Sequence, residues 1–342
     1  GWRLPFLVSI LLLLISVWIR LKLHESPVFA EMKAQGKGSK APLRESFLRW
    51  PNAKLVLTVL FGATAGQGVV WYAAQFYALY FLTTTLKLDY ASAYIHVAAA
   101  LFLATPFFIV CGALSDRFGR KKIILTGFLL SALTYFPIFR GLTECANPAL
   151  ARVMHEAPVV LHTEDYCGKL ELTLRAFADA ARKIVLPAKA HLSPTEKARG
   201  FLNQRSIPFT LAPATGSDIS LTIAGQEVAK GFDPNAFTAA LDAAGYGAIT
   251  KKMPDGKMAA DPTAIRSLPL TLLLTLLVLY VTMVYGPIAA YLVELFPTRI
   301  RYTSMSLPYH IGNGWFGGFL PLIAASIVVF TGDIYEIGRA NV

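Results

Sequence analysis

The sequence contains few charged residues, few cysteines and no recognisable cofactor motif. Charged residues make up 15% of its 342 residues, whereas a soluble domain carries about 25%. The three cysteines share no metal-ligand spacing with histidine, so we expect no metal site. A Walker motif is missing, and the G-x-G-x-x-G string at 312–317 lies inside an apolar run rather than after a strand, so we expect no nucleotide or other cofactor. His162, Asp165 and His191 form no nucleophile–base pattern, and we do not expect an enzyme.

The positive charge is unevenly distributed along the chain. Residues 140–266 hold 15 Lys and Arg against 13 Asp and Glu, so most of the net charge of +11 lies elsewhere, in short connections between apolar runs. Basic connections of this kind are typical of the cytoplasmic ends of membrane helices and not of a nucleic-acid-binding face. We therefore expect a lipid bilayer as a partner and no nucleic acid.

Six apolar segments are long enough to cross a bilayer, at about 20 residues per crossing. They are Leu4–Leu21, Leu55–Leu82, Ala93–Leu114, Ile123–Phe139, Leu268–Val293 and Thr303–Phe330. The predicted fold is an all-α membrane protein with six transmembrane helices and one polar insertion. Lys and Arg concentrate in the first, third and fifth connections, beginning with loop 22–54, which predicts that these are cytoplasmic and that the insertion lies outside.

The insertion at 140–266 has the signals of a small α+β domain. Ser193, Pro194 and Glu196 form a helix-start pattern, and Asp233-Pro234 opens a second helix through Ala244. Segments 207–212 and 219–224 are predicted strands. Cys145 and Cys167 would both lie outside the cell membrane, where a disulfide closing this loop stabilises by roughly 3 kcal/mol. Two free thiols are the alternative, whereas Cys111 is predicted to be a packing residue within a span.

A charged stretch at 112–122, GALSDRFGRKK, separates two apolar runs. It resembles the cytoplasmic loop signature of the major facilitator superfamily. GWRLPF at 1–6, HESPVF at 24–29, YGP at 285–287, ELFPTRIRY at 294–302 and GNGWFGGFLP at 312–321 resemble the metabolite:proton symporter branch of that family. Members of this branch carry proline and betaine, 2-oxoglutarate, citrate or shikimate.

The resemblance implies an organisation and a function. The chain would hold spans six to eleven of a twelve-span fold, with helices six to nine in 1–139, a periplasmic insertion in 140–266 and helices ten and eleven in 267–342. Its partners would be a small-molecule substrate, protons and the missing N-terminal half of the same transporter. The implied activity is proton symport of a small organic acid or zwitterion across the inner membrane by alternating access. The insertion departs from the family pattern, and a membrane-anchored sensor acting through it is the alternative.

The charged stretch also resembles a gate. In the family, the matching aspartate and arginine help to latch the cytoplasmic side, and here an ion pair of Glu294 with Arg117 or Arg120 is expected. The alternative is that the basic residues only fix the topology. The complete set of expected gate residues is Gly112, Asp116, Arg117, Gly119, Arg120, Glu294, Arg299 and Arg301.

Polar residues recur at helical spacing within the apolar runs, which predicts a substrate cavity because lipid cannot satisfy their hydrogen bonds. Interhelical hydrogen bonding without substrate contact is the alternative. His310 is a candidate proton relay, and no Asp or Glu lies in the middle of a span. The glycine pairs 62/66 and 314/318 predict close helix packing. The expected cavity residues are Gln67, Trp71, Gln75, Tyr285, His310 and Asn313.

Overall fold

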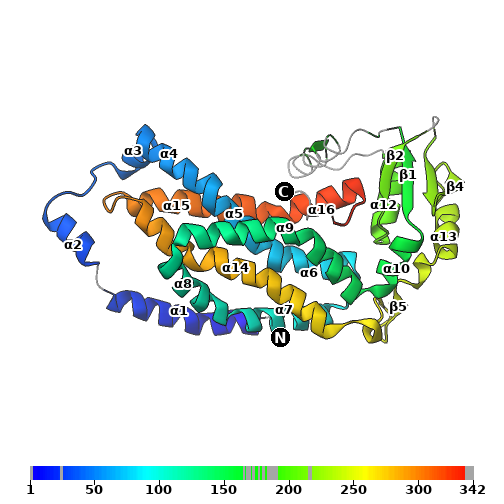
Figure 1. Cartoon of the computed structure of the whole chain (residues 1–342), viewed down its shortest axis with the longest axis horizontal. Coiled ribbons are helices and arrows are strands. Elements are labelled where there is room, and N and C mark those ends of the chain that lie inside the picture. Colours follow the sequence, from blue (N-terminus) through cyan, green and yellow to red (C-terminus); the bar gives the residue numbers. More distant parts are fainter. Residues whose placement is uncertain are drawn as a thin grey trace. The chain divides into compact units, whose positions relative to one another are not determined.

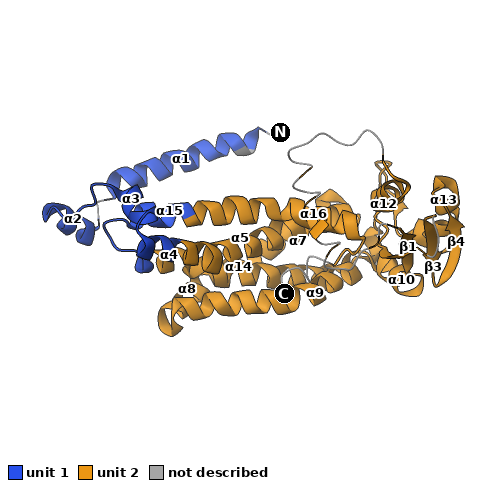
Figure 2. Ribbon diagram, turned by 90° about the horizontal axis from the view of Figure 1, so that it is seen from above, with its two compact units in different colours: residues 1–56, 293–307 blue, residues 57–292, 308–342 orange. Residues whose placement is uncertain are grey.

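The computed structural model describes residues 3–23, 26–164, 192–214 and 218–335, together with positions 166, 171, 174–175, 178 and 182 (Figure 1). Two compact units are present (Figure 2). Unit 1 comprises residues 1–56 and 293–307, and unit 2 comprises residues 57–292 and 308–342.

Unit 1 begins with three helices that all have proline in the first turn. They are α1 (Leu4–Lys22), α2 (Pro27–Ala34) and α3 (Pro42–Phe47). Proline suits this position because the missing N–H would have no partner inside the helix. Ser26 caps α2 by accepting a hydrogen bond from the Phe29 N–H at 3.3 Å. The unit also contains the first residues of α4 (Trp50–Val59), the end of α14 (Ser267–Leu295) and the first residues of α15 (Arg301–Ile311).

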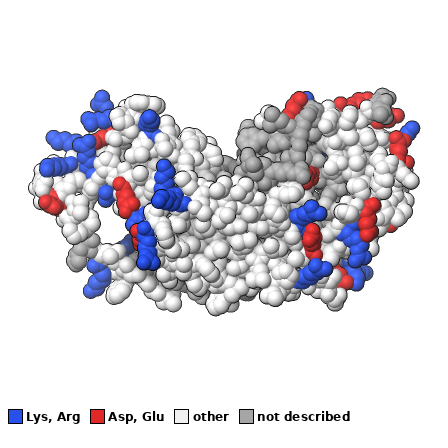
Figure 3. All heavy atoms as spheres, viewed as in Figure 1, with Lys and Arg blue, Asp and Glu red and all other residues white. Residues whose placement is uncertain are grey.

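Within the described residues, five continuous helices are long and apolar enough to cross a bilayer. They are Trp50–Thr85, Tyr90–Phe118, Arg120–Ala146, Ser267–Leu295 and Arg301–Thr331. A sixth is reached only if α1 and α2 form one span bent by 49°. On the face drawn in Figure 3, a broad middle region of the surface shows no Lys, Arg, Asp or Glu, as a bilayer core requires. The chain is therefore a multi-pass helical membrane protein.

The first and last of these five helices are interrupted by π-helical segments. The Trp50–Thr85 helix passes through α4, η1 (Leu60–Thr64), α5 (Ala65–Tyr72), η2 (Ala73–Tyr77), α6 (Ala78–Tyr80) and η3 (Phe81–Thr85). The Arg301–Thr331 helix consists of α15 (Arg301–Ile311), η6 (Gly312–Gly317) and α16 (Gly318–Thr331). The three spans between them are α7 (Tyr90–Ala104) together with α8 (Pro106–Phe118), then α9 (Arg120–Ala146), and then α14 (Ser267–Leu295). Because π-bulges disrupt the regular hydrogen-bond ladder, they are frequent at functional sites.

Glycines allow α5 and η6 to pack with their backbones almost in contact. A Cβ atom on Gly68 would lie 2.5 Å from the Gly312 carbonyl oxygen, and one on Gly317 would lie 2.6 Å from the Tyr72 ring. Of the predicted glycines, Gly66 permits a close contact, since a Cβ there would lie 2.9 Å from the Phe128 ring, whereas a Cβ on Gly62 or Gly314 would meet nothing within 4 Å. The glycines that permit the contact lie on the opposing faces of the two helices, a relation that spacing along one helix does not reveal.

The insertion folds around a four-stranded sheet in the order β2-β1-β3-β4. Strand β1 (Val159–Thr163) pairs in parallel with β2 (Thr210–Pro213) and antiparallel with β3 (Ser220–Ile223), which pairs with β4 (Gln226–Lys230). The two predicted strands thus exist but do not pair with each other, because β1 lies between them. Leu161 at the centre of β1 is fully buried.

Helices and short segments complete the insertion. They are α10 (Pro148–Glu156), α12 (Pro194–Gln204), α13 (Pro234–Ala243), η4 (Tyr246–Ala248), β5 (Lys251–Lys252), β6 (Met258–Ala259) and η5 (Pro262–Ala264). The predicted capping box of α12 is confirmed: Ser193 Oγ accepts from the Glu196 N–H at 3.1 Å, and Glu196 accepts from the Ser193 N–H at 2.8 Å. Asp233 caps α13 as expected, accepting from the Asn235 N–H at 3.0 Å.

The insertion is fixed to the ends of the neighbouring spans by hydrogen bonds. Asn147, which links α9 to α10, donates to the carbonyls of Leu86 and Ile249, both at 3.1 Å. Four further hydrogen bonds join the insertion to span ends: Ser206 Oγ to Thr84 O at 2.8 Å, Asn203 Nδ2 to Val329 O at 2.8 Å, Phe209 N to Gly332 O at 3.1 Å and Ala260 N to Lys87 O at 2.7 Å. The insertion is therefore anchored to several span ends and is not a domain on a free tether.

Candidate functional site

An amide pair deep within unit 2 joins the two π-interrupted helices. Gln67 of α5 donates from Nε2 to Asn313 Oδ1 at 3.0 Å, and Asn313 of η6 donates from Nδ2 to Gln67 Oε1 at 3.1 Å. Asn313 Nδ2 also donates to the Tyr309 carbonyl at 2.9 Å. Gln67 is 1% exposed. A buried amide is tolerated when its hydrogen bonds are made, and this pair satisfies both partners.

Aromatic side chains lie one helical turn from the amide pair. The Trp71 ring meets the Tyr285 ring edge-on, with centroids 4.6 Å apart, and the hydroxyls of Tyr285 and Tyr309 are 2.9 Å apart. Trp71 Nε1 is buried and has no hydrogen-bond partner among the described residues. We call Gln67, Trp71, Tyr285, Tyr309 and Asn313 the polar cluster.

The structure brings together four of the six expected cavity residues, and Tyr309 joins them. Tyr309 was missed by the sequence reasoning, although its position four residues before Asn313 places it on the same helical face. Gln75 lies two turns beyond Gln67 in η2 and is half-buried. His310 is exposed, and its ring contact is with the adjacent Tyr309, at 6.0 Å between centroids. Neither Gln75 nor His310 hydrogen-bonds to the polar cluster in the described structure.

The charged hinge forms a tight corner between α8 and α9. Gly119 has φ of +99°, a backbone conformation that favours glycine. Arg120 and Asp116 form an ion pair at 3.1 Å across this corner, with the Asp116 side chain 65% exposed. Gly112 lies a turn and a half earlier in α8, and Arg117 is exposed in its last turn. Such an exposed ion pair contributes only about 0.5 kcal/mol to stability, so its main effect is to orient the two side chains at the corner.

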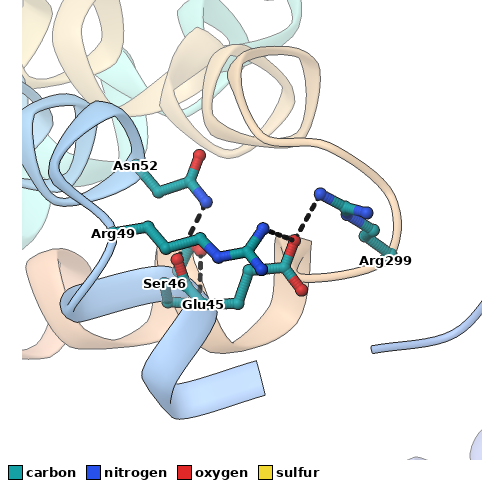
Figure 4. Close-up of polar contacts among 6 residues, drawn as sticks. Glu45, Ser46, Arg49, Asn52 and Arg299 are labelled. Carbon is teal, nitrogen blue, oxygen red and sulfur yellow. Dashed lines mark hydrogen bonds and ion pairs between the residues drawn. The ribbon is translucent and has the colours of Figure 1, made fainter. Parts of the chain in front are cut away.

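The remaining expected gate residues lie in unit 1, where Arg299 takes part in a cluster around α3 (Figure 4). Glu45 of α3 is 8% exposed and forms an ion pair with Arg299 and a longer one with Arg49, at 4.0 Å. Asn52 Nδ2 donates to the Glu45 carbonyl at 2.8 Å. Glu45 was missed by the sequence reasoning, because nothing in its local pattern distinguishes it from a solvated loop residue.

Hydroxyl and backbone contacts hold the same region of unit 1. The buried hydroxyls of Ser46 and Ser304 are 2.8 Å apart, so α3 is joined to α15 as well as to Arg299. Arg301 donates from Nε to the Phe296 carbonyl at 3.1 Å. Glu294 belongs to this unit, whereas Arg117 and Arg120 belong to unit 2, so the ion pair expected between them stays a prediction.

Of the two predictions about cysteines, one is confirmed and the other is not tested. Cys111 is 5% exposed within α8, with Sγ 3.4 Å from Thr282 Oγ1, which confirms its packing role. Cys145 is buried near the end of α9, and Cys167 lies outside the described residues, so the disulfide stays a prediction. No group of three potential metal ligands occurs in the part of the chain that the structure describes.

Apolar helices that enclose hydrogen-bonded polar side chains are an arrangement typical of membrane transport proteins. Residues 1–143 match the family model of the Major Facilitator Superfamily. The match covers less than half of the chain, so it places residues 1–143 beside that superfamily and does not extend to the other residues.

Curated relatives agree with this placement. The chain is 32% identical to the shikimate transporter of Escherichia coli (strain K12) over 145 residues, which is 42% of this chain and 32% of the relative. It is 29% identical to the alpha-ketoglutarate permease of the same strain over 151 residues, 44% of this chain and 33% of the relative. A putative proline/betaine transporter of Staphylococcus aureus (strain MSSA476) is 30% identical over 141 residues, 40% of this chain and 29% of the relative.

The chain spans about a third of the length of these curated relatives. They are transporters and not enzymes. No solved structure matches the chain significantly.

Proposed function

We propose that the chain forms part of a secondary transporter that moves a small organic acid or zwitterionic metabolite across the inner membrane by proton symport with alternating access. The polar cluster carries the proposal. It supplies hydroxyl and amide groups and one unpartnered indole N–H at the depth where lipid cannot satisfy them. The printed names of the relatives, which include shikimate and alpha-ketoglutarate carriers, support an anionic or zwitterionic metabolite.

We propose that the remaining wall of the substrate cavity comes from a second half like that of the relatives, of whose length this chain spans about a third. Trp71 Nε1 would donate to a substrate oxygen, and the amide pair would fix the neighbouring helices or open to contact the substrate. No Asp or Glu lies in the middle of a described span, so we propose that the acidic proton carrier lies in that half. His310, exposed in α15, would then face the other half and not the polar cluster.

Uptake into proteoliposomes tests the proposal. The protein is purified from native membranes in its longest form and reconstituted, and accumulation of radiolabelled shikimate, 2-oxoglutarate and proline is followed with an inward proton gradient. We expect one of these to accumulate and accumulation to disappear with a protonophore. Accumulation that is indifferent to the gradient would contradict proton coupling, and no accumulation of any metabolite by the longest form would contradict the transporter assignment.

We propose in addition that the insertion lies on the periplasmic side and that the hinge at 112–122 lies on the cytoplasmic side. The support is the concentration of Lys and Arg in alternate connections. The exposed Lys252 of β5 and the exposed Lys121 at the start of α9 are suitable positions for single cysteines. A membrane-impermeant maleimide applied to intact cells should label K252C and spare K121C. The reverse labelling would invert the topology.

A further inference from the structure

A pocket of about 320 Å³ lies where the insertion meets the end of the span bundle. Its wall combines the end of α12, the outer face of α13 and the η4 segment with one residue from the connection after η3, Lys87. All of these residues belong to unit 2 and to the described part of the chain. The volume is at the lower end of the range of small-molecule sites, about 300–1,000 Å³.

Lys87 supplies a positive charge that no acidic side chain of the described residues neutralises. Its side chain is half-buried, and no acidic side chain among the described residues lies within ion-pair distance. Burial lowers the pKa of its ammonium group. Its backbone is held in place, with φ of +57° and a hydrogen bond from the Ala260 N–H to its carbonyl at 2.7 Å. A half-buried cation without a partner is costly, and an anionic ligand would offset that cost.

A second cation on the pocket wall is oriented by its neighbours. The Arg205 guanidinium lies 3.9 Å above the centre of the Phe201 ring, and its Nη2 donates to Thr238 Oγ1 at 3.2 Å. These contacts restrain a side chain that would otherwise move freely in solvent. Arg205 and Lys87 therefore give the pocket two positive charges from two different parts of the fold.

The remaining lining limits which anion fits. Asp242 contributes one carboxylate, and Thr238 and Thr250 add hydroxyl groups, whereas the Tyr246 hydroxyl donates to the Ala157 carbonyl at 3.0 Å. Ile207, Leu241 and Ile249 line the apolar part and are at most 5% exposed. The pocket thus has an excess of one positive charge. A ligand with a single carboxylate matches this excess, while a phosphate dianion would meet the Asp242 carboxylate.

We propose that this pocket binds a small monocarboxylate that also carries hydroxyl or amino groups. The carboxylate would bind Lys87 and Arg205, and a hydroxyl or amino group would donate to Asp242. Because Lys87 belongs to the span connection and the other lining groups belong to the insertion, the bound ligand would strengthen the contact between them. The site goes beyond the proposed transport function, since it lies away from the polar cluster and requires no transport.

Calorimetric titration of the full chain in detergent tests this binding. The probes are gluconate and 4-aminobutyrate, with sorbitol as the neutral counterpart of gluconate and inorganic phosphate as the competing anion, all at constant ionic strength. The variants are Lys87→Gln and Arg205→Gln, with Lys252→Gln as the matched control because Lys252 is an exposed lysine outside the pocket. Size-exclusion profiles and melting temperatures establish whether each variant is folded. If K87Q does not fold, the binding measurement on R205Q tests the proposal.

We expect at least one carboxylate probe to bind saturably and sorbitol not to bind. K87Q and R205Q should each weaken that binding at least tenfold, and K252Q should leave it unchanged. The proposal is overturned if neither carboxylate binds, if sorbitol binds as well as gluconate, if phosphate binds more tightly than both carboxylates, or if a folded R205Q binds like the wild type. A carboxylate affinity that falls with Gln67→Leu but not with R205Q would place binding in the polar cluster instead, which would overturn this site and support the transport proposal.

Discussion

Replacing Asn147 with alanine should loosen the insertion from the span bundle. The Asn147 side chain is 2% exposed and makes three hydrogen bonds. It donates to the carbonyls of Leu86 and Ile249, both at 3.1 Å, and accepts from the Leu150 N–H at 3.0 Å. These bonds join a span connection, the η4 region and the start of α10. A single side chain therefore holds three segments that are distant in sequence.

The expected cost follows from those bonds. The truncation leaves two buried carbonyls without their donor, at about 1 kcal/mol or more each. It also removes the N-cap of α10, which contributes about 1 kcal/mol. The sum is about 3 kcal/mol, which corresponds to roughly a hundredfold change in a local opening equilibrium. The change should be local, because the polar cluster and the spans keep their own contacts.

Hydrogen–deuterium exchange of the detergent-solubilised chain measures this opening. We expect the amides of 148–152 and 246–250 to exchange about a hundredfold faster in N147A, with exchange in α14 unchanged. Asn235→Ala is the matched control, since Asn235 is an exposed asparagine in the first turn of α13, and its effect should stay within about 0.5 kcal/mol.

Asn147→Asp separates the two roles of the side chain. It keeps the oxygen that caps α10 but places a carboxylate against the two carbonyls. We expect it to be at least as destabilising as alanine. Wild-type exchange in N147D would mean that the cap alone matters, and wild-type exchange in N147A would refute the anchoring of the insertion.

Three further predictions concern other parts of the chain. Gln67→Leu should reduce uptake by the longest native form at least tenfold. Thermal unfolding should show that the free energy of unfolding falls by only about 1–2 kcal/mol, because Asn313 keeps its bond to the Tyr309 carbonyl. Unchanged uptake would contradict a role of the polar cluster in transport. A double-mutant cycle of Glu45→Gln and Arg299→Gln should give a coupling of about 1 kcal/mol in thermal unfolding, since Arg299 is half exposed; additive effects would contradict the ion pair. The Lys251 ammonium holds the pKa of Asp261 at about 2, below its ordinary 3.8. The resulting stabilisation should be present above about pH 4 and lost as pH falls toward 2, so wild type and Asp261→Asn should converge in melting temperature at the acid end, and parallel curves would show that the pair does not stabilise.

The spans and the helix starts of the insertion could be predicted from sequence because their causes are local. Apolar length decides which segments cross a bilayer, and five of the expected segments are long apolar helices in the structure. The capping box at Ser193 and Glu196 involves residues three positions apart, so its pattern can be recognised along the chain.

Contacts between distant segments could not be predicted in this way. Strand β1 separates β2 from β3, and no local pattern shows that it must lie between them. The Gln67–Asn313 bond joins residues 246 positions apart, so spacing indicated that each faces the bundle interior but not that they pair. Glu45 looks like any loop carboxylate until α3 places it beside Arg299. The glycines that permit close backbone contact are Gly68, Gly312 and Gly317, which lie on facing helices and not in the pairs expected from spacing.

The central claim is that the polar cluster of this chain is part of the substrate site of a transporter. Its most direct test is substrate-dependent quenching of Trp71 fluorescence in the longest native form, with the other tryptophans replaced by phenylalanine, because the buried Trp71 indole N–H has no hydrogen-bond partner among the described residues. The account predicts saturable quenching by the metabolite that the proteoliposomes accumulate, and its loss in Gln67→Leu. Accumulation of a metabolite that leaves Trp71 fluorescence unchanged at saturating concentration would contradict it.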